Sequence, residues 1–372
     1  MGVQERPTVC VSAFGMATAL APNLSDSYAA ARAGITRISE LDVSSNQDES
    51  MGDEQIAGCR ARYILPGFTG LAKALLLGKA GLADLQTMTS LTQSEALRAG
   101  ISINLSDQFL VDSNYEMFEE DDQLPSAIWK RECNELIPRL LRTCRLDIPP
   151  WNQRLYFGGH AEFVHTVREV EELLISGKLD RCVVGAIDSC IEAQFLRAAA
   201  IKGALKTSEN PVGFLPGEAA AFILLERTED VRLNKREPLA VLVGSCVLPS
   251  SSDRFSDQPP DGIVLARAID EALSQTLSLG NGEVEIIIGD LNGEEYRARD
   301  WGNALIRLRT GHNLANIPVE IPALAFGETG VATGPVGLCL GILSKQRSRS
   351  SGIAVEWLSS DNGSKAALCF IN

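Results

Sequence analysis

Residues 154 to 186 constrain the fold of this chain more than any other segment of its sequence. A short strand, Arg154 to Phe157, leads through the tripeptide Gly158-Gly159-His160 into a stretch whose apolar residues recur at helical spacing. Gly177 is placed to end that helix, and a second strand, Arg181 to Ala186, follows almost at once. A strand, a tight glycine turn, a buried helix and another strand form a βαβ unit with parallel strands.

Strand and helix patterns alternate along the rest of the chain and begin again after a charged stretch, Thr228 to Glu237. Before that stretch we expect strands at Thr8 to Phe14, Gly100 to Leu105 and Glu218 to Glu226, and helices at Ser25 to Ala33, Leu71 to Leu85 and Ile128 to Leu146. After it we expect strands at Leu239 to Cys246, Val284 to Gly289, Gly352 to Trp357 and Lys365 to Ile371, and helices at Asp261 to Leu277, Trp301 to Leu308 and Val331 to Leu343. Polar, acidic segments at Ser44 to Gln55 and Asp112 to Gln123 are expected to be solvated loops.

This repetition predicts two α/β halves, residues 1–236 and 237–372, with sheets covered by helices. A length of 372 residues also favours division, because a single hydrophobic core rarely grows to that size.

Composition excludes several classes of partner and site. The chain has 34 Lys+Arg and 48 Asp+Glu, so its net charge of −14 argues against binding nucleic acid or an anionic membrane. No apolar run is long enough to span a bilayer, and the first residues do not resemble a signal peptide. The nine cysteines include no Cys-x-x-Cys pair, which argues against a zinc site or a disulfide framework. We therefore expect a cytoplasmic protein without metal or cofactor.

Five segments, in order along the chain, carry a family likeness. Val11 to Leu20 is similar to an opening strand and turn, Gly177 to Ala186 to a G-x-x-D-x-x-x-x-G-G step, Gly213 to Ala221 to a GF-x-x-GEGAG turn, Gly327 to Gly337 to a GH-x-x-GAAG stretch, and Ser359 to Phe370 to a final GGTN turn and strand. Together they resemble the β-ketoacyl synthase (3-oxoacyl-ACP synthase) branch of the thiolase superfamily. The resemblance implies a thiolase fold, with two similar halves in a layered αβαβα arrangement, and a homodimer formed through the first half.

The resemblance also implies a Cys-His-His catalytic centre, which is substituted in this chain. The nucleophilic cysteine position falls on His160, the two histidine positions fall on Asp290 and Glu328, and the family lysine falls on Ala323. Two hydrogen-bond donors have thus become acceptors, and an ionised carboxylate has the wrong sign to stabilise an oxyanion or a malonyl carboxylate. Decarboxylating condensation is therefore not expected.

Two main interpretations of this centre stay open. In one, His160, Asp290 and Glu328 fill a disused pocket, and the protein is a non-catalytic binding, scaffold or adaptor component. In the other, His160 is a nucleophile or general base oriented by Asp290 or Glu328, and the protein is an acyltransferase or thioester hydrolase. A metal held by these three side chains is a third possibility, which no His-x-x-x-His or Cys pairing supports.

The remaining predictions concern the pocket and its partners. We expect the pocket to be shaped by Gly159, Gly213, Phe214, Gly217, Glu218, Asn292, Gly327 and Gly330. Glu218 is expected to satisfy backbone donors, His165 to pack or hydrogen bond, and His312 to be solvated. A protein partner could be an acidic carrier protein, met by Arg131, Arg139, Arg142 and Arg145, or a secretion effector, by analogy with substituted relatives of this family.

Overall fold

The fold is described from a computed structural model. The structure describes residues 8–41, 56–64, 67–89, 98–106, 125–254, 256, 258–277, 282–312, 314–349 and 351–372. The two predicted acidic loops, Ser44 to Gln55 and Asp112 to Gln123, lie outside these residues. Across the described residues, no helix combines the length and apolar character that crossing a membrane requires.

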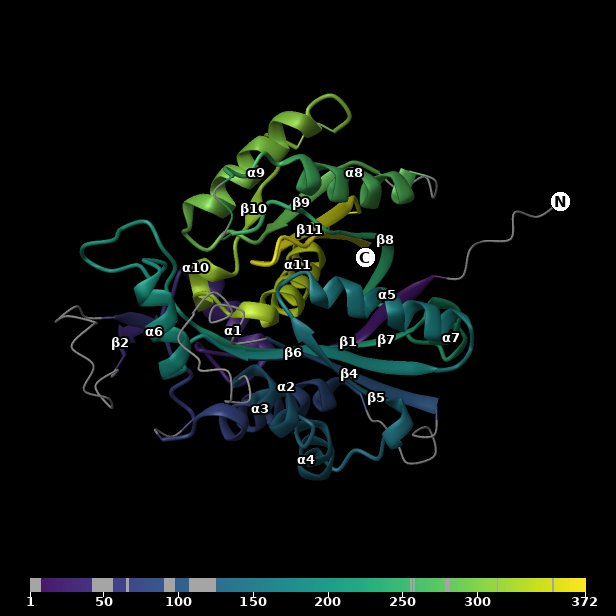
Figure 1. The fold of residues 1–372 in the computed structure, drawn as a ribbon. Coiled ribbons are helices and arrows are strands. Elements are labelled where there is room, and N and C mark those ends of the chain that lie inside the picture. Colours follow the sequence, from purple (N-terminus) through teal and green to yellow (C-terminus); the bar gives the residue numbers. More distant parts are fainter. Residues whose placement is uncertain are drawn as a thin grey trace.

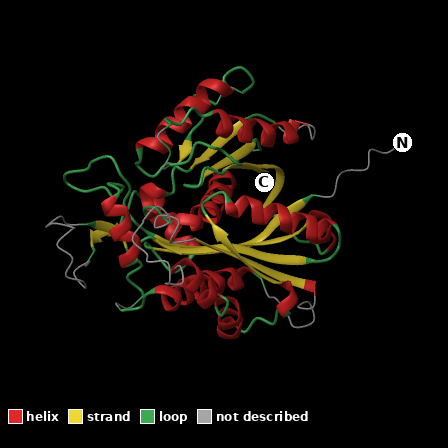
Figure 2. Ribbon diagram, in the orientation of Figure 1, coloured by secondary structure: helices red, strands yellow, loops and turns green. Residues whose placement is uncertain are grey.

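Ten strands form one mixed sheet that is built from two groups with the same topology (Figures 1 and 2). The first group is β1 (Val9–Thr18), β4 (Ala99–Ser106), β5 (Gln153–Gly158), β6 (Arg181–Ser189) and β7 (Glu218–Arg227). The second group is β8 (Ala240–Leu248), β9 (Val284–Gly289), β10 (Val319–Glu320), β11 (Ile353–Ser359) and β12 (Lys365–Ile371). A separate pair, β2 (Ile38–Glu40) and β3 (Ala57–Cys59), lies at one end of the molecule.

The strand order repeats from one group to the other. From the outer edge inward, the orders are β5-β4-β6-β7-β1 and β10-β9-β11-β12-β8, so each group places its third, second, fourth, fifth and first strands in turn. In both groups the first three of these strands run parallel to one another. The fourth strand pairs antiparallel with the third, and the fifth pairs antiparallel with the fourth. The groups meet where Cys10 pairs with Val241 and Val11 with Ala240. The prediction of two similar α/β halves is confirmed, and the boundary at residue 236 stays a prediction.

Helices form three layers around these strands, which gives the αβαβα arrangement (Figure 1). The middle layer contains α5 (Glu162–Ile175) and α11 (Thr333–Ser348), which is preceded by the short 3-10 helix η4 (Gly330–Ala332). One outer layer contains α2 (Gly70–Met88), α3 (Pro125–Cys133) and α4 (Leu136–Cys144). The other contains α8 (Ile263–Leu277) and α9 (Glu295–Leu308). The shorter helices are α1 (Leu24–Arg32), α6 (Ala193–Ile201), α7 (Thr228–Leu233), α10 (Ala323–Phe326) and η3 (Pro150–Asn152).

The βαβ unit predicted from the sequence is confirmed as β5, α5 and β6. The apolar stripe of α5, which includes Phe163, Val167 and Val170, is fully buried between the two groups of strands. Gly177 follows the helix with a φ of +70°, a backbone conformation that favours glycine. The predicted single helix from Ile128 to Leu146 is wrong, because it divides into α3 and α4 at residues 134 and 135.

Candidate functional site

His160 lies at the turn between β5 and α5, where the backbone has little room. A Cβ on the preceding Gly159 would lie 2.7 Å from Cβ of Ser360, so a larger residue could not be placed there without a shift. The hydroxyl of Ser360 also accepts a hydrogen bond from the backbone N–H of Ala161, at 2.9 Å. Ser360 therefore supports the turn. It also accepts from one of the N–H groups at the start of the helix, where anions otherwise bind.

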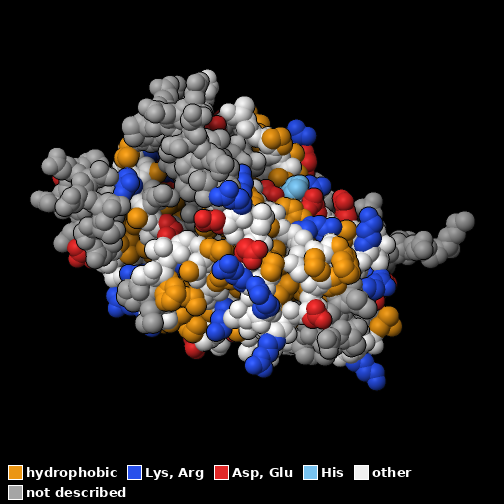
Figure 3. Space-filling view, turned by 60° about the horizontal axis from the view of Figure 1, so that its bottom comes forward, with side chains coloured by type: hydrophobic (Ala, Val, Ile, Leu, Met, Phe, Trp, Pro, Cys, Tyr) orange, Lys and Arg blue, Asp and Glu red, His pale blue; other side chains and the backbone are white. Residues whose placement is uncertain are grey.

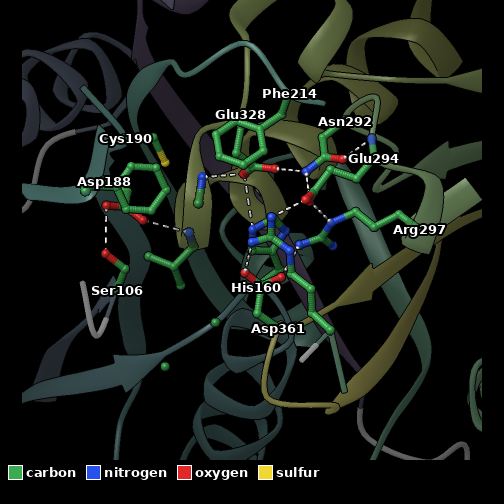
Figure 4. A pocket seen from close by; sticks show the side chains of 16 residues that line it. Ser106, His160, Asp188, Cys190, Phe214, Asn292, Glu294, Arg297, Glu328 and Asp361 are labelled. Atoms are coloured by element: carbon green, nitrogen blue, oxygen red, sulfur yellow. Dashed lines mark hydrogen bonds and ion pairs between the residues drawn. The ribbon is translucent and has the colours of Figure 1, made fainter. Parts of the chain in front are cut away.

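The three predicted centre residues meet in space, and Figure 4 shows two of them, His160 and Glu328. Nδ1 of His160 lies 2.8 Å from Oδ1 and 2.9 Å from Oδ2 of Asp290, which follows β9. Nε2 of the same ring lies 3.2 Å from Oε1 of Glu328, which precedes η4. All three side chains are buried. Both ring nitrogens of His160 are therefore held by carboxylates.

A second row of charged residues surrounds this triad and was not predicted from the sequence. Arg297 on α9 is fully buried, and it donates to Asp290 at 2.6 Å and to Asp361 at 3.0 Å. Arg254 donates to Asp361 at 3.1 Å and to Glu294. The residues come from distant loops and from a helix whose N-terminal end is rich in charge, so only the density of charge at Glu294 to Arg299 gave a signal.

The two carboxylates determine the charge of His160. Burial and the start of a helix both disfavour an imidazolium, but Asp290 and Glu328 outweigh them and raise the pKa of His160 to about 10. The same contact holds the pKa of Glu328 well below its usual range, against the opposing effect of burial. At neutral pH the ring is therefore a cation that donates from both nitrogens and has no lone pair free.

A cavity of about 70 Å³ lies beside the triad. Its walls include predicted pocket residues, namely Gly159, Phe214, Asn292 and Gly330, together with His160 and Glu328. They also include Ser106, Asp188, Cys190, Phe195, Arg254, Glu294, Arg297 and Asp361. The space suits a few water molecules or a small group rather than a drug-sized ligand, for which pockets of roughly 300 Å³ or more are usual.

The other predicted glycines shape the backbone behind the cavity. The N–H of Gly217 donates to the carbonyl of Glu328, and a Cβ on Gly217 would lie 2.1 Å from the carbonyl oxygen of Phe326. Gly327 has a φ of +74°, and the carbonyl of Gly213 lies 2.4 Å from where a Cβ on Gly293 would be. These contacts bring the residues around Glu328 close to the glycine turn.

Glu218 and the remaining histidines lie away from the triad. Glu218 accepts from the N–H of Ala61 at 2.7 Å, as expected, and it also forms an ion pair with the buried Lys73 at 3.4 Å. His165 is half exposed and lies 3.4 Å from Glu162. His312, expected to be solvated, is partly exposed, because its side chain is 15% exposed and pairs with the more exposed Asp270 at 2.9 Å.

Among the described residues, no group of three or more His, Cys, Asp or Glu side chains is arranged to hold a metal ion. The side chains around His160 are instead tied to one another by ion pairs.

Comparisons with known proteins identify the fold. No protein-family model and no curated protein matches the sequence. Among solved structures, the chain is similar to one chain of AntDE:AntF, a complex of a type II polyketide synthase acyl-carrier protein with its ketosynthase, with a TM-score of 0.76 and 14% identity over 99% of both chains. This chain has the thiolase-like ketosynthase fold.

Two further ketosynthase-fold structures agree. A β-ketoacyl synthase from Burkholderia phymatum STM815 matches with a TM-score of 0.71 and 15% identity, over 98% of this chain and 99% of the other. The ishigamide ketosynthase/chain length factor matches with a TM-score of 0.67 and 17% identity over the same shares. At such identities the likeness establishes the ketosynthase fold, and the chemistry has to be argued from the residues.

Proposed function

We propose that this ketosynthase-fold chain does not catalyse condensation and acts as a binding, scaffold or adaptor component. One observation carries the proposal: both ring nitrogens of His160 lie within 3.2 Å of a carboxylate, and those carboxylates keep the ring charged. A nucleophile or general base needs a free lone pair, which an imidazolium lacks. His160 is therefore a structural cation in this proposal.

Two neighbouring features support the same conclusion. Cys190, whose thiol lies in the cavity wall, has its pKa raised well above the usual value by burial, so it is not a thiolate. The N–H of Ala161, which could stabilise an oxyanion at the start of α5, already donates to Ser360.

The alternative is an acyltransferase or thioester hydrolase that uses His160. The convergence of His160, Asp290 and Glu328 favours it, because a histidine oriented by a carboxylate is a common arrangement for acid–base catalysis. It requires one carboxylate to move away, since a base must have one ring nitrogen free.

A homodimer through the first half is part of the proposal. Strand β5 is the outermost described strand at one edge of the sheet, and its residues 153–157 are partly exposed. Trp151, just before it, is 71% exposed. A sheet edge with apolar side chains readily pairs with another strand, and a second copy of β5 would extend the sheet.

We further propose a protein partner, either an acidic carrier protein or a secretion effector. Arg131, Arg139, Arg142 and Arg145 are all exposed on or beside α3 and α4. Figure 3 brings forward the side of the molecule on which these helices lie, and Lys and Arg side chains gather across it. The carrier is supported by one similar structure, which holds an acyl-carrier protein with its ketosynthase. The effector rests on the analogy alone.

Incubation with acetyl-coenzyme A and octanoyl-coenzyme A, followed by intact mass and thiol release, tests the proposal. We expect no adduct and no thiol release above the blank. His160→Ala is the test variant, and His165→Ala is the matched control because that ring is half exposed. An adduct, or thioester cleavage, that His160→Ala abolishes and His165→Ala retains would overturn the binding function in favour of the enzyme.

A further inference from the structure

Asp188, at the end of β6, differs from the other acids of the cavity. It is buried, and its carboxylate accepts hydrogen bonds from the hydroxyl of Ser106 at 2.8 Å, the N–H of Ser189 at 2.8 Å and the N–H of Val331 at 3.0 Å. Figure 4 shows the contact between Asp188 and Ser106. All three donors are neutral. Among the residues that the structure describes, no cation pairs with Asp188.

The other cavity acids are each compensated. Glu328 pairs with His160, Glu294 with Arg254, and Asp361 with both arginines of the cavity. An uncompensated buried carboxylate costs more free energy than a paired one, and taking up a proton relieves that cost. Asp188 is therefore the acid of this cavity that can change its charge most easily.

Asp188 also forms part of a wall between two cavities. The cavity beside His160 and a second one of about 10 Å³ are both lined by Ser106 and Asp188. The second cavity is about the size of one water molecule. It reaches the side of Asp188 that faces Trp129, Leu77 and Glu192.

We infer that Asp188 is a proton-operated switch in this wall. When it is ionised, its carboxylate holds Ser106 and the N–H of Val331, and so links β4 and β6 to η4. When it takes up a proton from solvent, it becomes a donor, and the hydroxyl of Ser106 reverses its role and accepts. The wall then loses a negative charge, and the binding of any charged group in the cavity changes with pH.

The charges that face Asp188 are consistent with a change near neutral pH. Burial is the largest effect and raises its pKa to about 6, opposed by the hydrogen bonds from Ser106, Val331 and Ser189 and by the charge of His160. Glu328 and the thiol of Cys190 also line this side. On the other side, Glu192 lines the second cavity, and its partner Lys73 lies 3.4 Å from the hydroxyl of Ser189.

Backbone amide NMR on the full-length protein between pH 5 and 8 tests the switch. The N–H signals of Ser189 and Val331 should move together with one midpoint near pH 6, and Asp188→Asn should abolish the movement. Ser106→Ala removes a hydrogen bond that favours the charged form, so it should raise the midpoint by roughly half to one pH unit. This second variant keeps the test open if Asp188→Asn does not fold.

The chain offers a matched control. The N–H groups of Met16 and Leu24 both donate to Asp84, each at 2.9 Å, and lie outside the cavity. Their titration should be the same in both variants and in the parent protein. Signals of Ser189 and Val331 that stay constant from pH 5 to 8, that move with separate midpoints, or that keep their midpoint in Ser106→Ala, would overturn the inference.

The switch would regulate the proposed binding function and therefore rests on it, but separate experiments test the switch and the binding function. Acyl transfer by His160 would overturn the binding function and leave the amide titration unchanged. A constant amide signal would remove the switch and leave the coenzyme A result unchanged.

Discussion

Replacing His160 with glutamine removes the cation that two buried carboxylates share, and its effect on stability follows from the pKa. Contact with Asp290 and Glu328 raises the pKa of His160 from 6.5 to about 10. Each pKa unit corresponds to about 1.4 kcal/mol, so the proton bound at pH 7 contributes about 4 kcal/mol to the free energy of unfolding. The lowered pKa of Glu328 reflects the same contact and is not added.

The pH dependence gives this prediction its sign. Because the pKa of His160 is higher in the folded than in the unfolded state, the proton on its ring stabilises the fold in full below pH 6.5. This contribution declines as the pH rises towards about 10. His160→Gln should therefore lower the unfolding free energy by about 4 kcal/mol at pH 7 and by less than about 1 kcal/mol at pH 10. Below about pH 4.5, the difference should also shrink, because Glu328 takes up a proton in the unfolded chain while the folded parent protein keeps it ionised.

Urea unfolding, followed by tryptophan fluorescence at pH 6, 7, 8.5 and 10, measures this difference. Trp301 and Trp357 stack at 5.1 Å inside the second half and report on its unfolding. His165→Gln is the control, because its ring is half exposed and its contact with Glu162 should contribute little. A loss below about 1 kcal/mol at pH 7, or one that is the same at pH 7 and 10, would refute the ionic role of His160.

Three further predictions concern other residues. Gly159→Ala should destabilise the fold by about 1 to 3 kcal/mol because its Cβ would press on Ser360, and Ser360→Gly should restore part of the loss in chemical denaturation. Glu356→Gln should stabilise the protein at pH 8 and have little effect at pH 4, because burial raises the pKa of this carboxyl, which has no hydrogen-bond partner among the described residues, well above its usual value. A stability gain equal at both pH values would contradict that reason. Leu155→Arg on β5 should convert a dimer to a monomer in light scattering, whereas exposed Ile306→Arg on α9 should not.

Local sequence patterns determined the elements of this fold well. The apolar spacing of α5 and the position of Gly177 predicted a helix and its end, because both depend on residues that are neighbours along the chain. The same reasoning failed between α3 and α4, where the apolar pattern continues but the helix does not. Periodicity shows which face is buried and cannot show where a helix is interrupted to follow a curved surface.

The charged residues around His160, Asp290 and Glu328 show why the site was predicted only in part. His160, Asp290 and Glu328 were found because a family pattern marks their positions. Arg254, Asp361 and Asp188 have no such mark, and nothing in their flanking sequence distinguishes them from surface charges. Their burial and contacts depend on segments far apart in the chain, such as those that bring Arg254 to Asp361 and Asp188 to Val331.

The sequence by itself therefore predicted most of the strands and helices and the two α/β halves, whereas the assignment of His160, Asp290 and Glu328 to the family's catalytic positions stays a prediction. Only the tertiary structure decided the charge of His160, because that charge depends on two carboxylates 130 and 168 positions away in the chain. A histidine in that position of the sequence could be a base, a ligand or a cation. Burial between Asp290 and Glu328 makes it a cation, since ion pairing there outweighs the cost of removing the charge from water.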